Sequence, residues 1–250
     1  MIIITATGIV FFLAFIFSML GLGGAMLYVP VFHWLGFGFK GAAVPTALLL
    51  NGITAATAAV IYHQNRMIDY KGSFPLILSS FLGAPCGAYL TKFIPTETLI
   101  LFFALAMLFA GGRMLVSSGE TDRQEMVPLP QRLVFMSAGG FGIGLIAGML
   151  GIGGGFLFVP LMLLLGYPTK NAAATSSFVV IFSSFSGFAG HVAGGHFNVL
   201  LMLATTMAVI AGALAGAYIM REKMKPGRIK LIFGLVLLGV GMKMFLGILV

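Results

Sequence analysis

The chain has 250 residues, of which 60% are apolar and only 8% are charged, and its formal net charge is +8. Soluble globular proteins average roughly 45–50% apolar and 25% charged residues, so this composition excludes a soluble domain. The apolar stretches continue for about 20 residues without the alternation of a membrane β-barrel, which predicts an all-α polytopic membrane protein. The basic residues lie between these stretches, which indicates membrane orientation and no nucleic-acid partner.

The predicted helices follow in chain order from the apolar runs. They cover residues 3–20, 25–36, about 43–62, 73–91 and 98–116, and then 133–150, 155–166, about 173–192, 199–220 and 229–249. The runs at 25–36 and 155–166 cannot cross a membrane alone, since a helix of this length spans about 18 Å of a hydrocarbon core of roughly 30 Å. Each short run either continues the preceding helix past a kink or turns back as half of a re-entrant hairpin.

The chain repeats itself after 130 residues. The segment Gly21-Leu-Gly-Gly-Ala-Met-Leu-Tyr-Val-Pro30 matches Gly151-Ile-Gly-Gly-Gly-Phe-Leu-Phe-Val-Pro160, and the same register pairs Lys40 with Lys170. Such internal similarity indicates two copies of one unit. We therefore divide the chain into repeat 1 (1–116), a polar linker (117–131) and repeat 2 (132–250).

Basic residues favour the cytoplasmic side of a membrane and so distinguish the two arrangements of the short runs. With kinked helices, the 14 basic residues divide 8 to 6 across the membrane; with a reversal at each glycine cluster, they divide 11 to 3. The larger group is Arg66, Lys71, Arg113, Arg123, Arg132, Lys170, Arg221, Lys223, Lys225, Arg228 and Lys230, and the smaller is Lys40, Lys92 and Lys243. The stronger bias predicts two inverted repeats, each with a glycine-broken first helix and three further transmembrane helices, and both termini outside.

A glycine cluster precedes each short run. A helix that starts inside the membrane has free backbone N–H groups and a positive dipole end there. Two such ends that converge at mid-depth are typical of secondary transporters and suit a small anion. The predicted backbone of the site comprises Gly21, Gly23, Gly24, Ala25, Gly151, Gly153, Gly154 and Gly155. The alternative is that these glycines only permit close helix packing, as we expect for Gly144, Gly148, Gly212 and Gly216.

Polar side chains form a stripe on the helix after each short run. The stripe is Thr46, Thr54 and Thr57 in repeat 1, with Asn51 on a neighbouring face, and Ser176, Ser183, Ser184 and His191 in repeat 2. We predict that Asn51, Thr54, Ser183 and Ser184 bind the substrate, and that Thr46, Thr57 and Ser176 line its path. The alternative is that the hydroxyl groups bond back to their own helices.

Four basic side chains lie near the ends of the predicted helices. All four are candidates for the mouths of a pathway: Lys40 and Lys170 could gather anions there, and protonation of His63 or His191 could couple transport to pH. The alternative is that the lysines are interface anchors and that the histidines form hydrogen bonds at the membrane surface.

The sequence lacks the residues that several other functions require. No Asp or Glu lies inside a predicted apolar run, which excludes the carboxylate relay of a proton-driven pump. The chain has no phosphate-binding loop, and its single cysteine, Cys86, excludes a multi-cysteine metal site. Ser186 and His191 are five residues apart and do not share a helix face. The sequence therefore predicts no enzyme, no metal and no cofactor.

The doubled Gly-x-Gly-Gly-Ala/Gly…Val-Pro motif resembles the TauE/SafE family, the sulfite exporters or toluene-sulfonate uptake permeases. The segments Gly83-Ala-Pro-Cys-Gly-Ala-Tyr89 and Gly212-Ala-Leu-Ala-Gly-Ala-Tyr218 and the polar linker add to this resemblance. The sequence departs from the motif at Ala25, which stands where the second copy has Gly155.

The resemblance implies a multi-pass protein of a prokaryotic inner membrane. It implies a secondary transporter, of the exporter type, for small sulfur-containing anions such as sulfite, sulfoacetate or other organosulfonates. The residues alone indicate an anion of unspecified chemistry. The partners expected are this anion and the lipid bilayer, and a homodimer is an assembly that the sequence leaves open. The alternative functions are a passive anion channel and a membrane scaffold subunit that transports nothing.

Overall fold

The computed structural model describes residues 2–20, 23–116, 126–192, 199–223 and 226–249. In these ranges the chain forms ten α-helices, a π-helical turn (η1) and a 3₁₀ turn (η2), and no strand. The elements are α1 (Ile2–Leu20), α2 (Ala25–Trp34), η1 (Phe39–Ala43), α3 (Val44–Gln64), α4 (Tyr70–Leu90), η2 (Thr91–Phe93), α5 (Thr96–Val116), α6 (Leu129–Leu150), α7 (Gly155–Leu164), α8 (Thr169–Val192), α9 (Val199–Lys223) and α10 (Pro226–Leu249).

Six apolar segments of the described chain are long enough to cross a membrane. They are Phe39–Gln64, Tyr70–Phe93, Thr96–Arg113, Leu129–Leu150, Lys170–His191 and Leu201–Ile219. Together with the all-helical structure, they confirm the predicted class. The chain is an all-α polytopic membrane protein.

Several helices begin earlier in the chain than predicted, and two of these starts have a clear physical reason. Helix α6 begins at Leu129, inside the predicted linker, because Pro130 lies in its first turn, where a missing N–H group removes no hydrogen bond. Helix α5 begins at Thr96, so Glu97 lies in its first turn, where a carboxylate is favourable beside the positive end of the helix dipole. Prolines and charged residues, which indicate a loop when the sequence is considered alone, are thus also favourable in the first turn of a helix.

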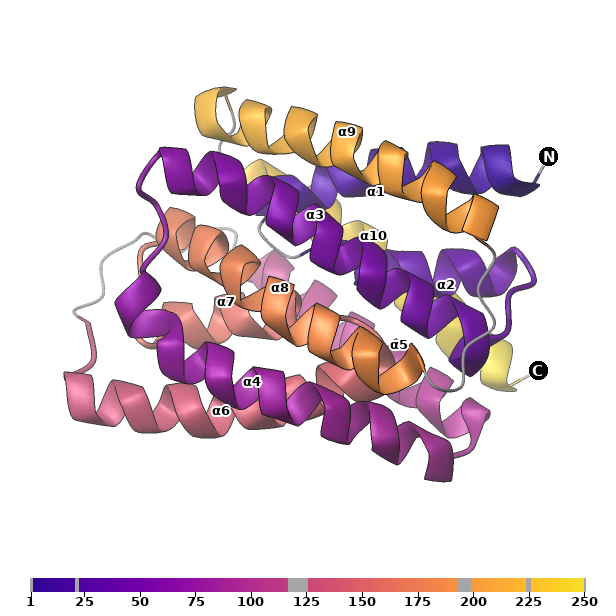
Figure 1. Ribbon diagram of the computed structural model, residues 1–250, viewed down its shortest axis with the longest axis horizontal. Helices are drawn as coiled ribbons and strands as arrows, with labels where there is room; N and C mark the ends of the chain where they lie inside the picture. Colours follow the sequence, from indigo (N-terminus) through magenta and orange to yellow (C-terminus); the bar gives the residue numbers. More distant parts are fainter. Residues whose placement is uncertain (1, 21–22, 117–125, 193–198, 224–225, 250) are drawn as a thin grey trace.

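Helices α1 and α9 pack along one side of the molecule and α4 and α6 along the opposite side, with α3 and α8 between them (Figure 1). Glycines allow the outer pairs to approach closely. A Cβ atom at Gly216 of α9 would lie 2.0 Å from the carbonyl oxygen of Phe15, and one at Gly148 of α6 would lie 2.0 Å from that of Ala84. These positions confirm the predicted packing role, which is typical of membrane helices.

The two short helices lie toward opposite ends of the molecule (Figure 1). Helix α2 does not continue α1: it begins beside the middle of α3 and runs toward the end where both chain termini lie. It then joins α3 through η1. The chain therefore reverses after α1, as the re-entrant alternative requires. The opposite orientation of the two units in a membrane stays a prediction.

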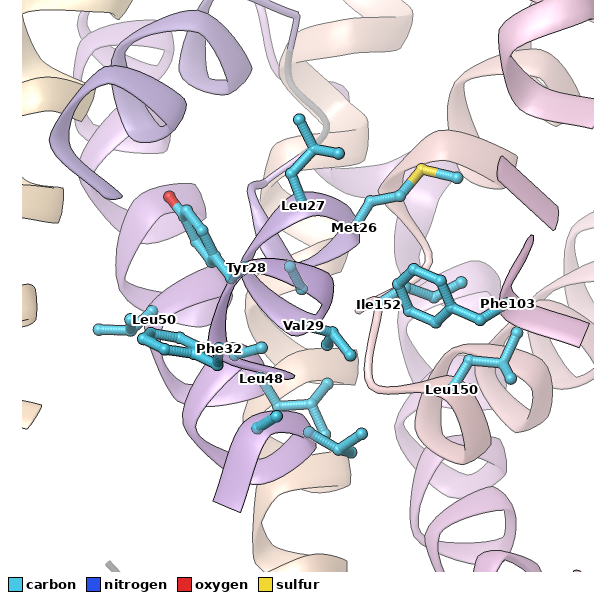
Figure 2. Packing of buried hydrophobic residues seen from close by; sticks show 14 of the residues in the cluster. Met26, Leu27, Tyr28, Val29, Phe32, Leu48, Leu50, Phe103, Leu150 and Ile152 are labelled. Carbon is cyan, nitrogen blue, oxygen red and sulfur yellow. The ribbon is translucent and has the colours of Figure 1, made fainter. Parts of the chain in front are cut away.

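The two glycine breaks share one apolar core. Met26 and Val29 of α2 are buried in a cluster with Phe103 of α5 and with Leu150 and Ile152 beside the second break (Figure 2). Lipid tails are as apolar as these side chains, so their burial stabilises the fold mainly through close packing. The packing holds the two breaks near each other at the centre of the molecule.

Candidate functional site

The Asn51 side chain joins the two units at the centre of the molecule. It is fully buried in α3. Its Oδ1 accepts hydrogen bonds from the backbone N–H groups of Gly24 and Ala25, the latter at 2.9 Å. Its Nδ2 donates to Ser184 Oγ of α8 at 2.7 Å. One amide therefore connects the N-terminus of α2 with a helix of the second unit.

Both glycine breaks are in close contact with the side-chain amide of Asn51. Gly23 has φ +76° and a Cβ atom there would lie 2.0 Å from Asn51 Oδ1. Gly153 has φ +66°, and its Cβ would lie 2.0 Å from Asn51 Nδ2 and 2.5 Å from Ser184 Oγ. Any side chain at either position would strain the backbone and displace a hydrogen-bonded group. Glycine is therefore required at both positions for the two breaks to meet.

The N-terminus of α2 already binds an oxygen atom. The first N–H groups of a helix have no partner within the helix, and the helix dipole favours a negative group beside them. In this conformation the partial negative charge of Asn51 Oδ1 occupies the position that suits an anion. The first break therefore has the donor geometry of an anion site, with a neutral ligand from the protein itself.

A second polar pair lies beside the first break. Tyr28 of α2 and Thr54 of α3 are fully buried, and their hydroxyl oxygens lie 3.1 Å apart. Thr54 also donates to the carbonyl oxygen of Leu50 at 2.8 Å. The Tyr28 hydroxyl was missed in the sequence, although a signal was present: Phe158, the equivalent residue of the second copy, has no hydroxyl.

At the second break, serine side chains bind carbonyl groups. Helix α6 ends at Leu150 and is followed by Gly151 in the left-handed conformation, with φ +74°. Ser183 Oγ donates to the Gly153 carbonyl oxygen at 2.7 Å, and Ser176 Oγ to that of Gly155 at 3.4 Å. The N–H group of Leu157 bonds back to the Gly154 carbonyl oxygen. Among the residues that the structure describes, no side chain accepts a bond from the N–H groups of Gly155 and Phe156 at the start of α7.

The remaining predicted residues lie apart from this centre. Gly21 falls outside the described residues. Thr46 is buried in the first turn of α3. Thr57 donates to its own helix, at the Ile53 carbonyl oxygen, as the alternative for these hydroxyl groups expects. His63 bonds Tyr70 at the exposed turn between α3 and α4, and Lys170 is exposed at the start of α8.

The two predicted mouth residues Lys40 and His191 line one cavity. It lies at the ends of α4 and α8 and the start of η1, and Lys92 is part of the same wall. Sequence reasoning did not select Lys92, because the helix ends that bring it beside Lys40 and His191 are distant in the chain.

The opposite end of the molecule carries a polar link between the units. Asp69 caps α4 through the Gly72 N–H group, and its other carboxylate oxygen accepts a bond from the Tyr167 hydroxyl at 2.8 Å. The Asp69 N–H group donates to Thr175 Oγ1 of α8. Burial raises the pKa of Tyr167 above its ordinary value and the bond to Asp69 adds to this, so the hydroxyl remains a donor. The link joins the α3–α4 turn to the second unit.

The family model described as Sulfite exporter TauE/SafE matches residues 6–244. This chain belongs to the TauE/SafE family. It is 29% identical over 247 residues to the Probable membrane transporter protein YunE of Bacillus subtilis, a match that covers 90% of each chain. It is 23% identical over 245 residues to the Probable membrane transporter protein MJ0441 of Methanocaldococcus jannaschii, over 92% of this chain and 90% of that protein.

A plant relative matches this TauE/SafE chain over a shorter range. Sulfite exporter TauE/SafE family protein 3 of Arabidopsis thaliana is 35% identical over 91 residues, which are 36% of this chain and 18% of the plant protein. No solved structure matches the chain. The family and the apolar helices together make this protein a multi-pass membrane transporter.

Proposed function

We propose that this protein is a secondary transporter that exports small sulfur-containing anions, such as sulfite, sulfoacetate or other organosulfonates. Its place is the inner membrane of a prokaryotic cell, and it has no enzymatic activity. The family description supports a sulfur-containing anion. The observation that carries the proposal is the Asn51 oxygen at the N-terminus of α2, where two backbone N–H groups hold a partial negative charge.

In the proposed mechanism the substrate replaces the Asn51 oxygen. A sulfite or sulfonate oxygen accepts the bonds from the Gly24 and Ala25 N–H groups, and the anion gains the stronger, charge-assisted form of each bond. The freed Asn51 amide and the Ser184 hydroxyl both carry donors for the same anion. The first N–H groups of α7 approach it from the second unit. No lysine or arginine is needed, so the anion is bound without becoming trapped by a full opposite charge.

The burial of the site favours a transporter over a passive channel. Asn51, Thr54 and Ser184 are completely buried, so the substrate reaches them only after helices move. A site that opens to one side at a time is the alternating-access arrangement of secondary transporters. Saturable flux with counterflow of labelled anion is the expected signature, whereas a passive channel would give flux proportional to the gradient.

The proposed transport cycle also needs inverted units, and two equivalent exposed positions test this topology. Gly38 and Pro168 are 130 residues apart, precede η1 and α8, and are both exposed. After replacement of the exposed Cys86 by Ser, we expect Gly38→Cys to react with an impermeant thiol reagent from outside the cell and Pro168→Cys only from inside. Labelling of both from the same side would contradict the inverted repeats.

Flux through proteoliposomes tests the function itself. We expect the purified protein to move sulfite or a small organosulfonate, and Gly154→Val to abolish this flux, because Gly154 has φ +80° and a β-branched residue is strained there. The matched control is Gly142→Ala, at an exposed glycine of α6 with open space around it. Absence of flux for a broad panel of sulfur-containing anions would contradict the proposal and favour the scaffold alternative.

A further inference from the structure

A small cavity opens at the end of the molecule where α4 and α8 finish. It has a volume of about 110 Å³, and its described lining is Lys40, Gly41, Ala88, Thr91, Lys92, Gly190 and His191. Since a water molecule occupies about 30 Å³ of liquid, the cavity has room for a few waters or for one small oxoanion. It is too small for a peptide or a nucleotide.

The charge of the cavity has one sign. Two lysines contribute positive charge to its wall, and the lining residues that the structure describes include no carboxylate. Like charges that line a concave wall of low dielectric raise the local concentration of oppositely charged ions. The cavity therefore favours anions and disfavours metal ions and amines.

Helix stability does not explain the position of Lys40. The residue lies in the first turn of the helical segment that starts at Phe39, where a cation opposes the helix dipole. Its Nζ donates one bond, to the Ile94 carbonyl oxygen after η2. An ammonium group has three donors, so this bond fixes the group at the cavity wall and leaves donors for a ligand.

The floor of the cavity is connected to the second glycine break. His191 Nε2 bonds the Gly148 carbonyl oxygen at 2.9 Å, and Thr91 Oγ1 donates to the Met149 carbonyl oxygen at 3.1 Å. Both carbonyl groups belong to the last turn of α6, immediately before Gly151. Two side chains of the cavity wall thus hold the helix end that leads into the break.

We infer that the cavity lined by Lys40, Lys92 and His191 is an anion vestibule at the end of the pathway predicted to face outward, where it binds a small oxoanion that passes between the second glycine break and the outside. This inference rests on the proposed function and extends it. The vestibule raises the anion concentration beside α6 by electrostatic attraction, and the central site selects the substrate. Its contribution therefore lies in the apparent affinity of transport and depends on ionic strength.

Charge reversal at Lys92 tests the vestibule. Lys92 is exposed and makes a cation–π contact with Tyr89, at 5.5 Å to the ring centroid. For sulfite flux in proteoliposomes at about 20 mM salt, we expect Lys92→Glu to raise KM roughly threefold to tenfold with an unchanged maximal rate. The difference from the wild type should disappear near 0.5 M salt. The matched control is Lys71→Glu, which reverses an exposed charge at the start of α4, at the opposite end of the molecule from η2, and we expect it to leave KM unchanged.

Binding gives a readout that needs no transport. Sulfate at low ionic strength should raise the unfolding temperature of the detergent-solubilised protein, and Lys92→Glu should weaken this shift. If the protein moves no sulfur-containing anion but this binding difference is present, the proposed function fails and the vestibule stands. Equal sulfate shifts in the wild type and Lys92→Glu, or a KM change that high salt does not remove, would overturn the vestibule.

Discussion

The two glycine breaks have nearly the same sequence but opposite hydrogen-bond chemistry. At the first break a side chain accepts bonds from backbone N–H groups, through Asn51 Oδ1. At the second break side chains donate to backbone carbonyl groups, through Ser183 and Ser176. The N-terminus of α2 is therefore closed by the protein, while that of α7 is bonded to no described side chain.

The cause of this difference lies in the helices that follow the breaks. In the register that aligns the two motifs, Asn51 corresponds to Ile181 and Ile53 to Ser183. The second unit has no amide to cover the start of α7, and the first has no serine to bind the break carbonyl. The two copies of the backbone motif thus have different hydrogen-bond partners because single residues differ on the helices that follow them. We expect the first break to act as the gate and the second as the open half of the anion site.

Gly153→Ala should have the largest effect on stability. The left-handed φ of +66° costs an L-residue about 1–2 kcal/mol, and the new methyl group would displace Asn51 and Ser184 from their mutual bond. We expect a loss of about 3 kcal/mol, seen as a large fall in unfolding temperature or in the yield of monodisperse protein. Wild-type stability in Gly153→Ala would contradict the close contact of the breaks.

Gly24→Ala should be milder, because the two breaks differ in backbone strain. Gly24 has φ −147°, outside the left-handed region, and the obstacle is the Tyr28 ring, 2.1 Å from the added Cβ. We expect overpacking to cost about 2 kcal/mol, measured by thermal unfolding in detergent. The double variant Gly24→Ala/Tyr28→Ala should be more stable than the sum of its single changes predicts. Strict additivity would show that the ring is not the obstacle.

Tyr28→Phe should cost about 1 kcal/mol, the usual value of one buried hydrogen bond, here the bond with Thr54. The ring itself should still fit, since the second break has Phe158 at the equivalent position. Denaturant or thermal unfolding measures the change. A loss several times larger would mean that the hydroxyl has a role that the Thr54 contact does not explain.

Ser183→Ala should have the smallest effect and lower the free energy of unfolding by about 0.5 kcal/mol. A carbonyl oxygen that loses one hydrogen-bond partner costs less free energy than an N–H group that is left unpaired. The bond concerned is 2.7 Å long and ends on Gly153. Ser176→Ala, whose bond to Gly155 is 3.4 Å long, serves as the comparison and should be close to neutral. Equal and large losses in both would contradict the different roles of the two breaks.

The sequence was sufficient to predict the helices and the two glycine breaks, but it was not sufficient to predict which residues are in contact at the breaks. Runs of apolar residues and the repeat of 130 residues place α2 and α7, because length and periodicity are local properties. Asn51 was predicted as a substrate-binding residue, but its bonds to the first break and to Ser184 were not, because these partners are 26, 27 and 133 residues away in the chain. Which oxygen covers a helix end depends on packing between helices, and one sequence does not encode that directly.

The most direct test of the central claim is the effect of Asn51→Asp on sulfite flux in proteoliposomes. A carboxylate at this position keeps an acceptor for the Gly24 and Ala25 N–H groups and accepts a bond from Ser184. This carboxylate would occupy the proposed anion position permanently and prevent the substrate from binding there. We predict at least a tenfold loss of flux with an unfolding temperature within a few degrees of the wild type, while Asn65→Asp, at an exposed amide, transports normally. Full sulfite flux through Asn51→Asp at equal incorporation would contradict an anion site at this break.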